Sequence, residues 1–286
     1  MSVDGARVPR DPIVAAAGDI ACPGSSETGT PKTCQMAATS DVIADAGMTV
    51  SAVLPLGDLQ YPSGSYAEFI TYYNATWGEY KSIEHPVPGN HEYYTPGASG
   101  YFRYFGLAAG DPHKGYYSYN LGAWHLIAIN ANCGDIGGCA AGSPEELWLK
   151  HDLTGRKGCM LAYWHQPRFS SGLHHDDLTY QVFWRDLHAA GADVVLNGHD
   201  HDYERFAPQT STGALDQVRG IREFVAGTGG ADHYPIKAID RHSEVRDNAH
   251  FGVLFLTLHP QSYSWRFVSI DGMVRDAGST ACHLTG

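Results

Sequence analysis

Residues 52–61 read AVLPLGDLQY, an apolar run of five residues that ends in Gly57 and Asp58. A run of this length, rich in aliphatic residues and closed by glycine, is typical of a short buried strand. The same pattern stands earlier in the chain, where residues 13–19 read IVAAAGD. We therefore expect strands that each deliver a polar side chain just beyond their carboxyl end.

Helical patterns alternate with these strands. Residues 35–46 space their apolar side chains as a helix does and are followed by Gly47, and a second helix is expected from Tyr66 to about Trp77. The remaining expected elements are a hairpin over 116–120 and 124–130, a helix over 144–153 with Ser143 as its N-cap, a strand over 160–164, a helix over 180–190, a strand over 194–197 and several strands between 222 and 274. This order of strands and helices is typical of a mixed α/β fold.

Polar residues that can bind metal stand at five of the expected strand ends. They are Asp19, Asp58 with Tyr61, Asn90 with His91, His165, and His199 with His201. Strand ends converge on one edge of a layered α/β fold, so residues far apart in sequence can form one site there. Carboxylate, amide, phenol and imidazole donors without a thiolate suit iron, zinc or manganese. Their number suits two ions about 3.5–4 Å apart, with Asp58 as the bridging ligand.

Five blocks of sequence carry a resemblance to a known family. In chain order they are GDIA from Gly18, GDLQY from Gly57, GNHE from Gly89, the strand-ending His165 and GHDH from Gly198. This ordered set resembles the signature of the calcineurin-like metallophosphoesterases, and the GDxxY form is similar to purple acid phosphatases in particular. The resemblance implies an α/β (α+β) fold, a four-layer α/β/β/α sandwich of two mixed β-sheets flanked by helices. The strands after Arg222 are expected to complete the second sheet.

Carried over block by block, the resemblance implies a ligand set. Asp19, Tyr61 and His201 would hold one metal, Asn90, His165 and His199 the other, and Asp58 would bridge them. Many relatives place a histidine two residues after the first aspartate, whereas this chain has Ala21 there, and Tyr61 takes the vacant position. A free phenol has a pKa of about 10, so a tyrosinate ligand near neutral pH needs a strong Lewis acid. We therefore expect iron(III) at the Tyr61 site and divalent zinc, iron or manganese at the second.

The resemblance also implies residues that act on the substrate. His91, His174 and His175 would bind the phosphate oxygens and protonate the departing group, which makes them the candidate catalytic residues. Imidazole suits this role because its unperturbed pKa is about 6.5. Arg168 is a further candidate for substrate binding, although a surface salt bridge would equally explain it. An ordinary solvated loop is the alternative for His174 and His175.

The implied reaction is hydrolysis of a phosphate monoester, in the manner of an acid phosphatase, by attack of metal-bound hydroxide on phosphorus. A phosphodiesterase acting on nucleotides or phospholipid head groups is the alternative enzyme, because the same metal core serves both ester types. A metal-dependent binding protein that has kept the site without turnover is the alternative outside enzymes. The expected partner is a small phosphate-ester substrate, and no protein partner is inferred.

Composition narrows the possible partners further. The 286 residues include 31 acidic and 19 basic residues, which gives a formal net charge of −12. Such a charge argues against binding a nucleic-acid polymer or an anionic membrane surface. No run of about 18 apolar residues is present, so no membrane insertion is expected. No obvious linker interrupts the chain, which favours a single catalytic domain over residues 1–286.

The six cysteines bear on the compartment. None of them forms a CxxC pair, and several lie in stretches rich in Gly, Pro and Ser, which favours disulfides over a zinc site. The favoured pairs are Cys22–Cys34, Cys133–Cys139 and Cys159–Cys282, and six free thiols in a cytosolic protein are the alternative. Disulfides favour a secreted protein, extracellular or periplasmic. The first seven residues have no apolar core, so no signal peptide is expected within this chain.

Overall fold

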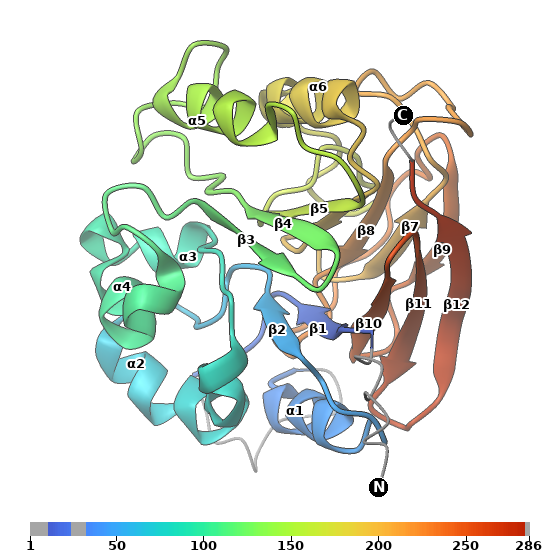
Figure 1. The fold of residues 1–286 in the computed structure, drawn as a ribbon. Helices are drawn as coiled ribbons and strands as arrows, with labels where there is room; N and C mark the ends of the chain where they lie inside the picture. The colour runs from blue at the N-terminus through green and yellow to red at the C-terminus, as the bar shows by residue number, and fades with distance from the viewer. Residues whose placement is uncertain (1–10, 24–32, 284–286) are drawn as a thin grey trace, which may run out of the picture.

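The computed structural model describes residues 11–23 and 33–283 and contains two mixed β-sheets packed face to face (Figure 1). The five-stranded sheet has the order β12 (Val274–Ala281), β11 (Ser262–Ser269), β10 (Gly252–His259), β1 (Ile13–Ala17) and β2 (Ala52–Pro55). The seven-stranded sheet has the order β3 (Tyr117–Leu121), β4 (Trp124–Ala128), β5 (Met160–Tyr163), β6 (Val194–Asn197), β8 (Arg222–Ala226), β7 (Tyr203–Phe206) and β9 (Ser243–Asp247). Helices flank both sheets, which confirms the expected four-layer α/β sandwich.

The helices are divided between the two outer faces (Figure 1). Over the five-stranded sheet lie α1 (Met36–Ala44), α2 (Tyr66–Thr71) and α4 (Ser99–Phe105), and over the seven-stranded sheet lie α5 (Pro144–Leu153) and α6 (Gln181–Ala190). The shorter elements are α3 (Asn90–Tyr93) and the 3-10 turns Tyr73–Ala75, Trp77–Ile83, Pro96–Ala98, Gly106–Ala109 and Leu178–Tyr180. The predicted N-cap of α5 is confirmed, because the Ser143 hydroxyl accepts a hydrogen bond from the Glu146 amide at 3.3 Å.

Alternate residues of each strand face different layers of the sandwich. In β1, Val14 and Ala16 pack in the core between the two sheets, whereas Ala15 and Ala17 pack in the core beneath α1, α2 and α4. In β4, Ile127 packs beneath α5 and α6 while its neighbours face the other sheet. Both faces of these strands are therefore buried. This explains why they appear in the sequence as continuous apolar runs rather than as an alternating pattern.

The helix expected from Tyr66 to about Trp77 is shorter than predicted. α2 ends at Thr71, and the chain continues as two 3-10 turns. The amide of Tyr73 donates to the side-chain oxygen of Gln60 at 3.1 Å instead of to the carbonyl one helical turn earlier. This side-chain contact ends the α-helix and ties it to the loop after β2.

The strands after Arg222 do not all belong to one sheet, which corrects the expectation that they complete the second. β8 and β9 join the seven-stranded sheet, whereas β10, β11 and β12 join the sheet of β1 and β2. β1 is buried on both faces and needs a hydrogen-bonded neighbour on each edge. β2 pairs with one edge in parallel and β10 with the other in antiparallel orientation.

Two of the three favoured disulfides are present and one prediction is wrong. The bridges are Cys133–Cys139 and Cys159–Cys282, whereas Cys22 and Cys34 are free thiols. The Cys22 thiol instead donates to the carbonyl of Ala231 at 3.3 Å, which gives this buried sulfur a partner. Composition favours a disulfide in such a loop but does not determine how the two Cβ atoms are oriented.

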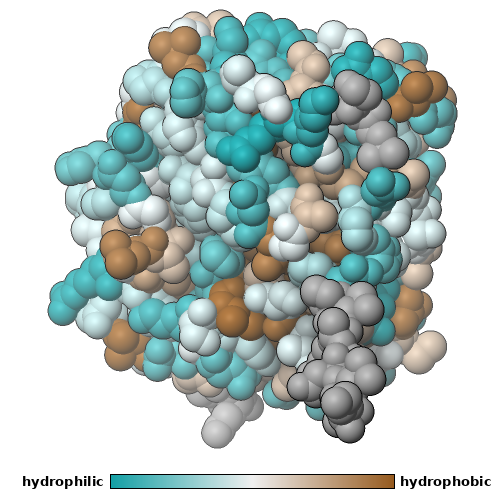
Figure 2. Space-filling model, in the orientation of Figure 1, coloured by the Kyte–Doolittle hydropathy of each residue, from teal (hydrophilic) through white to brown (hydrophobic). Residues whose placement is uncertain are grey.

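Exposed apolar residues are dispersed on the face of the molecule that Figure 2 shows. On the face shown in Figure 2, hydrophobic residues are scattered among hydrophilic ones rather than gathered in a single patch. Isolated exposed apolar residues of this kind are ordinary on folded proteins. Within residues 11–23 and 33–283, none of the helices combines the length and the apolar character needed to cross a bilayer.

Candidate metal centre

The predicted ligands come together at one end of the sandwich, where strands of both sheets end. β1 runs parallel to β2 in one sheet and β5 parallel to β6 in the other, so each pair presents its C-terminal ends together. The residues just beyond these four strands are Asp19, Asp58, His165 and His199. The Gly18 amide donates to the carbonyl of Ala226, at the end of β8, at 2.9 Å and thereby links the two sheets beside the site.

Three of these residues adopt left-handed backbone conformations. The φ angles are 59° at Asp19, 48° at Asp58 and 72° at His199. Residues other than glycine rarely adopt this backbone region. Its cost of about 1–3 kcal/mol per residue is tolerated mainly at functional sites. β1, β2 and β6 are therefore each followed by a sharp turn at the residue that carries the predicted ligand.

One group of donor atoms surrounds His165. Its Nε2 lies 3.1 Å from Oδ2 of Asp58 and 3.2 Å from Nδ1 of His199. These three side chains offer ligand atoms that all lie within 4.8 Å of one another. Two imidazole nitrogens and a carboxylate oxygen this close are a suitable set for one metal ion.

A second group surrounds the hydroxyl of Tyr61. This oxygen lies 2.9 Å from Oδ1 of Asp19 and 3.0 Å from Nε2 of His201. It also lies 3.3 Å from Oδ2 of Asp58, the same oxygen that contacts His165. Asp58 therefore lies between the two groups, as a bridging ligand must.

Asn90 adds an unsatisfied acceptor to the site. Its side-chain oxygen is buried and has no hydrogen-bond partner, although buried amide oxygens are nearly always bonded. Asn90 begins α3, and the amide of the next residue, His91, donates to Oδ1 of Asp58 at 2.8 Å. An amide oxygen that accepts no hydrogen bond from the described residues can bind a cation. Asn90 therefore fits the donor set.

The remaining nitrogens of two histidines are anchored outside the site. Nδ1 of His165 lies 2.9 Å from the carbonyl of Leu56, and Nδ1 of His201 lies 2.5 Å from the carboxylate of Asp232. Such partners fix the ring and direct Nε2 towards the donor groups, as is usual for histidines that bind metal. The residues present therefore fit a pair of metal ions.

Burial and neighbouring charges oppose each other in this cluster. Burial raises the pKa of Asp58, but the charges and hydrogen bonds of His165 and His91 together outweigh it and hold the pKa well below the ordinary value. Burial lowers the pKa of His165, whereas the charge of Asp58 raises it to about 9. In the second group burial lowers the pKa of His201, and the charge of Asp19 raises it to about 10. These buried carboxylates thus need positive charge beside them, and cations meet that need.

His199 differs from these two histidines. Burial and the charges of His165 and His174 lower its pKa to about 4. Its imidazole is therefore neutral near pH 7, which is the form that binds a metal ion.

The predicted substrate residues are arranged unequally around this centre. Nε2 of His91 lies 3.8 Å from Asp58, and the ring of His174 stacks on that of His199 with centroids 4.0 Å apart. His175 is exposed and follows His174 in a left-handed conformation, with φ 61°. The structure thus brings His91 and His174 to the donor groups.

Arg168 is not brought to the centre. It is buried, its guanidinium lies 3.4 Å from Asp176 and packs on the ring of Phe169, and it lines a separate pocket beside Asp240. The contact with Asp176 corresponds to the salt bridge considered from the sequence.

The site contains residues that the sequence alone did not single out. Asp232 holds His201, and the ring of Tyr234 stacks on the same imidazole at 3.8 Å. Glu92 accepts from the amides of Leu59 at 2.9 Å and Gly89 at 2.7 Å, which fastens the two loops that carry Asp58 and Asn90. Glu92 is the last letter of the GNHE block and could have been found from it, whereas no local pattern marks Asp232 or Tyr234.

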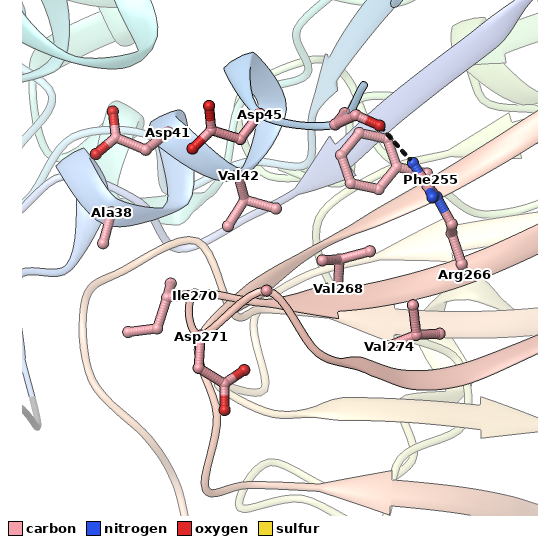
Figure 3. A pocket seen from close by; sticks show the side chains of 12 residues that line it. Ala38, Asp41, Val42, Asp45, Phe255, Arg266, Val268, Ile270, Asp271 and Val274 are labelled. Carbon is pink, nitrogen blue, oxygen red and sulfur yellow. Dashed lines mark hydrogen bonds between the residues drawn. The ribbon is translucent and has the colours of Figure 1, made fainter. Parts of the chain in front are cut away.

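A cleft of about 500 Å³ lies over the second donor group. Its lining includes Tyr61, His91, His201, Asp232 and Tyr234. A different hollow of about 400 Å³ lies between α1 and strands β10 to β12, on the far side of the five-stranded sheet (Figure 3). Its lining includes the apolar side chains of Val42, Phe255 and Val268. Arg266, which also lines it, donates to the carbonyl of Ala46 at 3.1 Å. That hollow contains none of the predicted ligands, so the cleft over Tyr61 is the candidate substrate site.

Comparison with known proteins was made by sequence and by structure. A family model described as calcineurin-like phosphoesterase matches residues 14–203. Purple acid phosphatase 15 of Arabidopsis thaliana is 31% identical over 97 residues, which cover 32% of this chain and 18% of that protein.

Among solved structures, the purple acid phosphatase PPD1 from yellow lupin (Lupinus luteus) seeds has a TM-score of 0.76 at 17% identity, covering 94% of this chain and 53% of the lupin chain. A dimetal phosphatase from Danio rerio has a TM-score of 0.63 at 13% identity, over 96% of this chain and 100% of that chain. GAP50, the anchor in the inner membrane complex of Plasmodium, has a TM-score of 0.69 at 13% identity, over 97% of this chain and 90% of that chain. At such identities these structures are similar in fold alone. The chain spans about half of the lupin protein and less than a fifth of the Arabidopsis protein.

Proposed function

Since the chain belongs to the calcineurin-like phosphoesterase family, we propose that it is a hydrolase that cleaves phosphate monoesters at a centre of two metal ions, in the manner of an acid phosphatase. The observation that carries this proposal is the position of Asp58. Its Oδ2 lies 3.1 Å from His165 and 3.3 Å from Tyr61, between two groups of donor atoms. A single ion would leave one of these groups without a function.

The donor sets divide the ligands between the two ions. Asp19, Tyr61 and His201 would hold one ion, Asn90, His165 and His199 would hold the other, and Asp58 would contact both. When bound, the ions supply Lewis acidity, which polarises the phosphoryl group and neutralises its negative charge. The chain itself positions the substrate and moves protons. His91 is placed to bind the substrate. Its Nδ1 lies 2.7 Å from the carbonyl of Pro62, which leaves Nε2 for the phosphate.

The phenol of Tyr61 bears on the identity of the first metal. It ligates only as the phenolate, and iron(III) is a Lewis acid strong enough to keep it so near neutral pH. We expect iron(III) at the Tyr61 site and divalent zinc, iron or manganese at the other. Elemental analysis by mass spectrometry should find two metals per chain, and a visible absorption band should disappear in Tyr61→Phe. A colourless, iron-free enzyme with full activity would contradict the iron assignment.

Turnover of matched substrates tests the reaction. The metal-loaded chain should hydrolyse 4-nitrophenyl phosphate faster than bis(4-nitrophenyl) phosphate, and removal of the metals by a chelator should lower the rate by more than about a thousandfold until they are restored. Faster turnover of the diester would identify a phosphodiesterase, which uses the same metal core. Absence of turnover of either ester, with both metals bound, would favour a metal-dependent binding protein.

We also propose that the protein acts outside the cytosol, in the extracellular space or the periplasm. Two disulfides support this location because such bonds persist mainly in oxidising compartments. Titration of thiols in the denatured, unreduced protein should detect two groups. Six reactive thiols in protein purified from its own cells would contradict the proposal.

A further inference from the structure

Asp200, the third residue of the GHDH block, has no role in the ligand set. It lies between His199 and His201 in sequence and is completely buried. Its Oδ1 accepts hydrogen bonds from the backbone amide of His174 at 3.0 Å and from Nδ1 of the same residue at 2.9 Å. The carboxylate of Asp200 therefore holds a histidine whose ring stacks on that of the predicted ligand His199.

The loop before His174 is folded around this carboxylate. The hydroxyl of Ser170 donates to Oδ2 of Asp200, and the amide of Gly172 donates to the Ser170 hydroxyl at 2.9 Å. A Cβ atom at Gly172 would collide with the carboxylate carbon, so the close approach requires glycine. The backbone amide of His174 and the hydroxyl of Ser170 thus hold the two oxygens of Asp200, in addition to the hydrogen bond with the imidazole.

His174 itself remains accessible. Its side chain is 40% exposed, and its ring stacks on His199 and meets the edge of Tyr234 with centroids 5.4 Å apart. With Nδ1 held by the carboxylate, Nε2 lies on the other side of the ring, away from Asp200. No hydrogen bond from the described residues occupies that nitrogen, so it is available to a phosphate ester bound beside His199.

Within residues 11–23 and 33–283, the side chains of the other two candidate histidines make no hydrogen bond to a carboxylate, although Nε2 of His91 lies 3.8 Å from Asp58. Nδ1 of His91 bonds a backbone carbonyl, a neutral acceptor, whereas Nδ1 of His174 bonds a carboxylate. Charge-assisted hydrogen bonds are roughly twice as strong as neutral ones and fix the ring more firmly. His175 is exposed and turns away from the regular backbone with φ 61°.

We propose that Asp200 is a positioning residue that makes His174, rather than His91 or His175, the proton donor to the leaving group. This inference rests on the proposed phosphatase function. In the step considered, the oxygen of a water molecule forms a bond to phosphorus, and the ester P–O bond breaks with its electron pair on the ester oxygen. Nε2 of His174 gives its proton to that oxygen, and a proton released by the attacking water restores it.

Leaving groups of different basicity test this assignment. A nitrophenolate departs without a proton, whereas an alkoxide needs one. In metal-loaded Asp200→Asn, kcat/KM for a simple alkyl phosphate should fall by about 10–100-fold, the usual cost of losing such a partner, while that for 4-nitrophenyl phosphate falls less than about threefold. An equal fall for both substrates would assign Asp200 a structural role only and overturn the proposal.

His174 variants make the test independent of whether Asp200→Asn folds. The side chain of His174 is exposed, and His174→Ala should show the same selective loss on alkyl esters, whereas His175→Ala should lower both substrates alike. Adding Asp200→Asn to His174→Ala should then change neither rate further, because the two residues act as one unit. Additive losses in the double variant, or the selective loss in His175→Ala, would overturn the proposal.

A matched control comes from a second aspartate–histidine pair in the chain. Asp152 lies 2.6 Å from Nε2 of His125, which stands at the start of β4, far from the strand ends that form the site. Asp152→Asn should leave the ratio of alkyl to nitrophenyl turnover unchanged. If the metal-loaded parent chain hydrolyses neither ester, the proposed function fails. If the parent is active and Asp200→Asn leaves the ratio unchanged, only the inference about Asp200 fails.

Discussion

β5 and β6 run parallel, and side chains that could bind metal lie close together at both ends of this pair of strands. The two groups differ in how their side chains are bonded. Beyond their C-terminal ends, His165 and His199 meet Asp58, and before their N-terminal ends Cys159, Asp193 and Cys282 meet. Both sets place three side chains that can bind metal within 4.8 Å of one another. At the N-terminal end, however, the two sulfurs are joined in a disulfide. Proximity of such groups alone therefore does not make a metal site.

The partners of the two buried carboxylates account for the difference. Asp193 accepts from the backbone amides of Met160 at 2.8 Å and His283 at 2.6 Å, so its oxygens are used to fasten the chain. Asp58 is surrounded by imidazole and phenol groups that are themselves held from behind. Asp58 also accepts from the backbone amide of His91, but its other oxygen, Oδ2, lies among the side chains of His165 and Tyr61 and can accept a cation.

The largest expected effect separates the two ends by activity. His199→Ala removes a proposed metal ligand and should lower kcat by about 10³–10⁴-fold on 4-nitrophenyl phosphate with little loss of stability. His283→Ala is the matched change at the other end and should retain wild-type kcat. The measurement is steady-state turnover together with metal content and a thermal melt. Equal losses in the two variants would remove the distinction between the ends.

The next effect separates them by stability. Cys282→Ser opens a bridge between residues 123 positions apart and should lower the free energy of unfolding by about 3–5 kcal/mol, because the unfolded chain regains the freedom that the bridge removed. Turnover at 25 °C should stay within about twofold of the parent. Guanidinium unfolding and the same turnover assay check both statements. A large loss of kcat in the folded variant would mean that the disulfide end also supports catalysis.

The smallest effect appears in the pH dependence of stability. Burial raises the pKa of Asp193 to about 7, so the folded state binds its proton more tightly than the unfolded chain does. The stability that this gives is complete below about pH 4 and is lost as the pH rises through about 7. Asp193→Asn cannot ionise, so its unfolding free energy should lack this fall. The two curves should diverge by roughly 1–2 kcal/mol between pH 6 and 8, and parallel curves would contradict the assignment.

Where a strand and the polar residue after it are neighbours in the chain, the sequence predicted which side chains the structure brings together. Asp19, Asp58, His165 and His199 follow apolar runs, and parallel strands bring such positions to one edge. Ser143 was predictable for a similar reason, because a cap and its helix are adjacent. In both cases the deciding interaction is local or follows from regular strand geometry.

The rest depends on contacts between distant segments. Asp232 meets His201 through a loop whose path follows from packing, and Gln60 ends α2 through a side-chain bond that no helical pattern reveals. The left-handed backbone at Asp19 and Asp58 is uncommon for residues other than glycine, although aspartate adopts it more often than most, and no local pattern in the sequence marks it. The Cys22–Cys34 pairing was wrong because composition does not fix the distance or direction between two side chains.

The position of β10 beside β1 has a consequence for biosynthesis. The strand that covers the open edge of β1 is formed by residues 252–259, which are translated long after residues 13–17. At about 5–20 residues per second, the ribosome takes roughly 10–50 seconds to deliver that partner. During this interval the edge of β1 that β10 later covers has no partner from β10, and this sheet is completed only after residues 252–259 have been made.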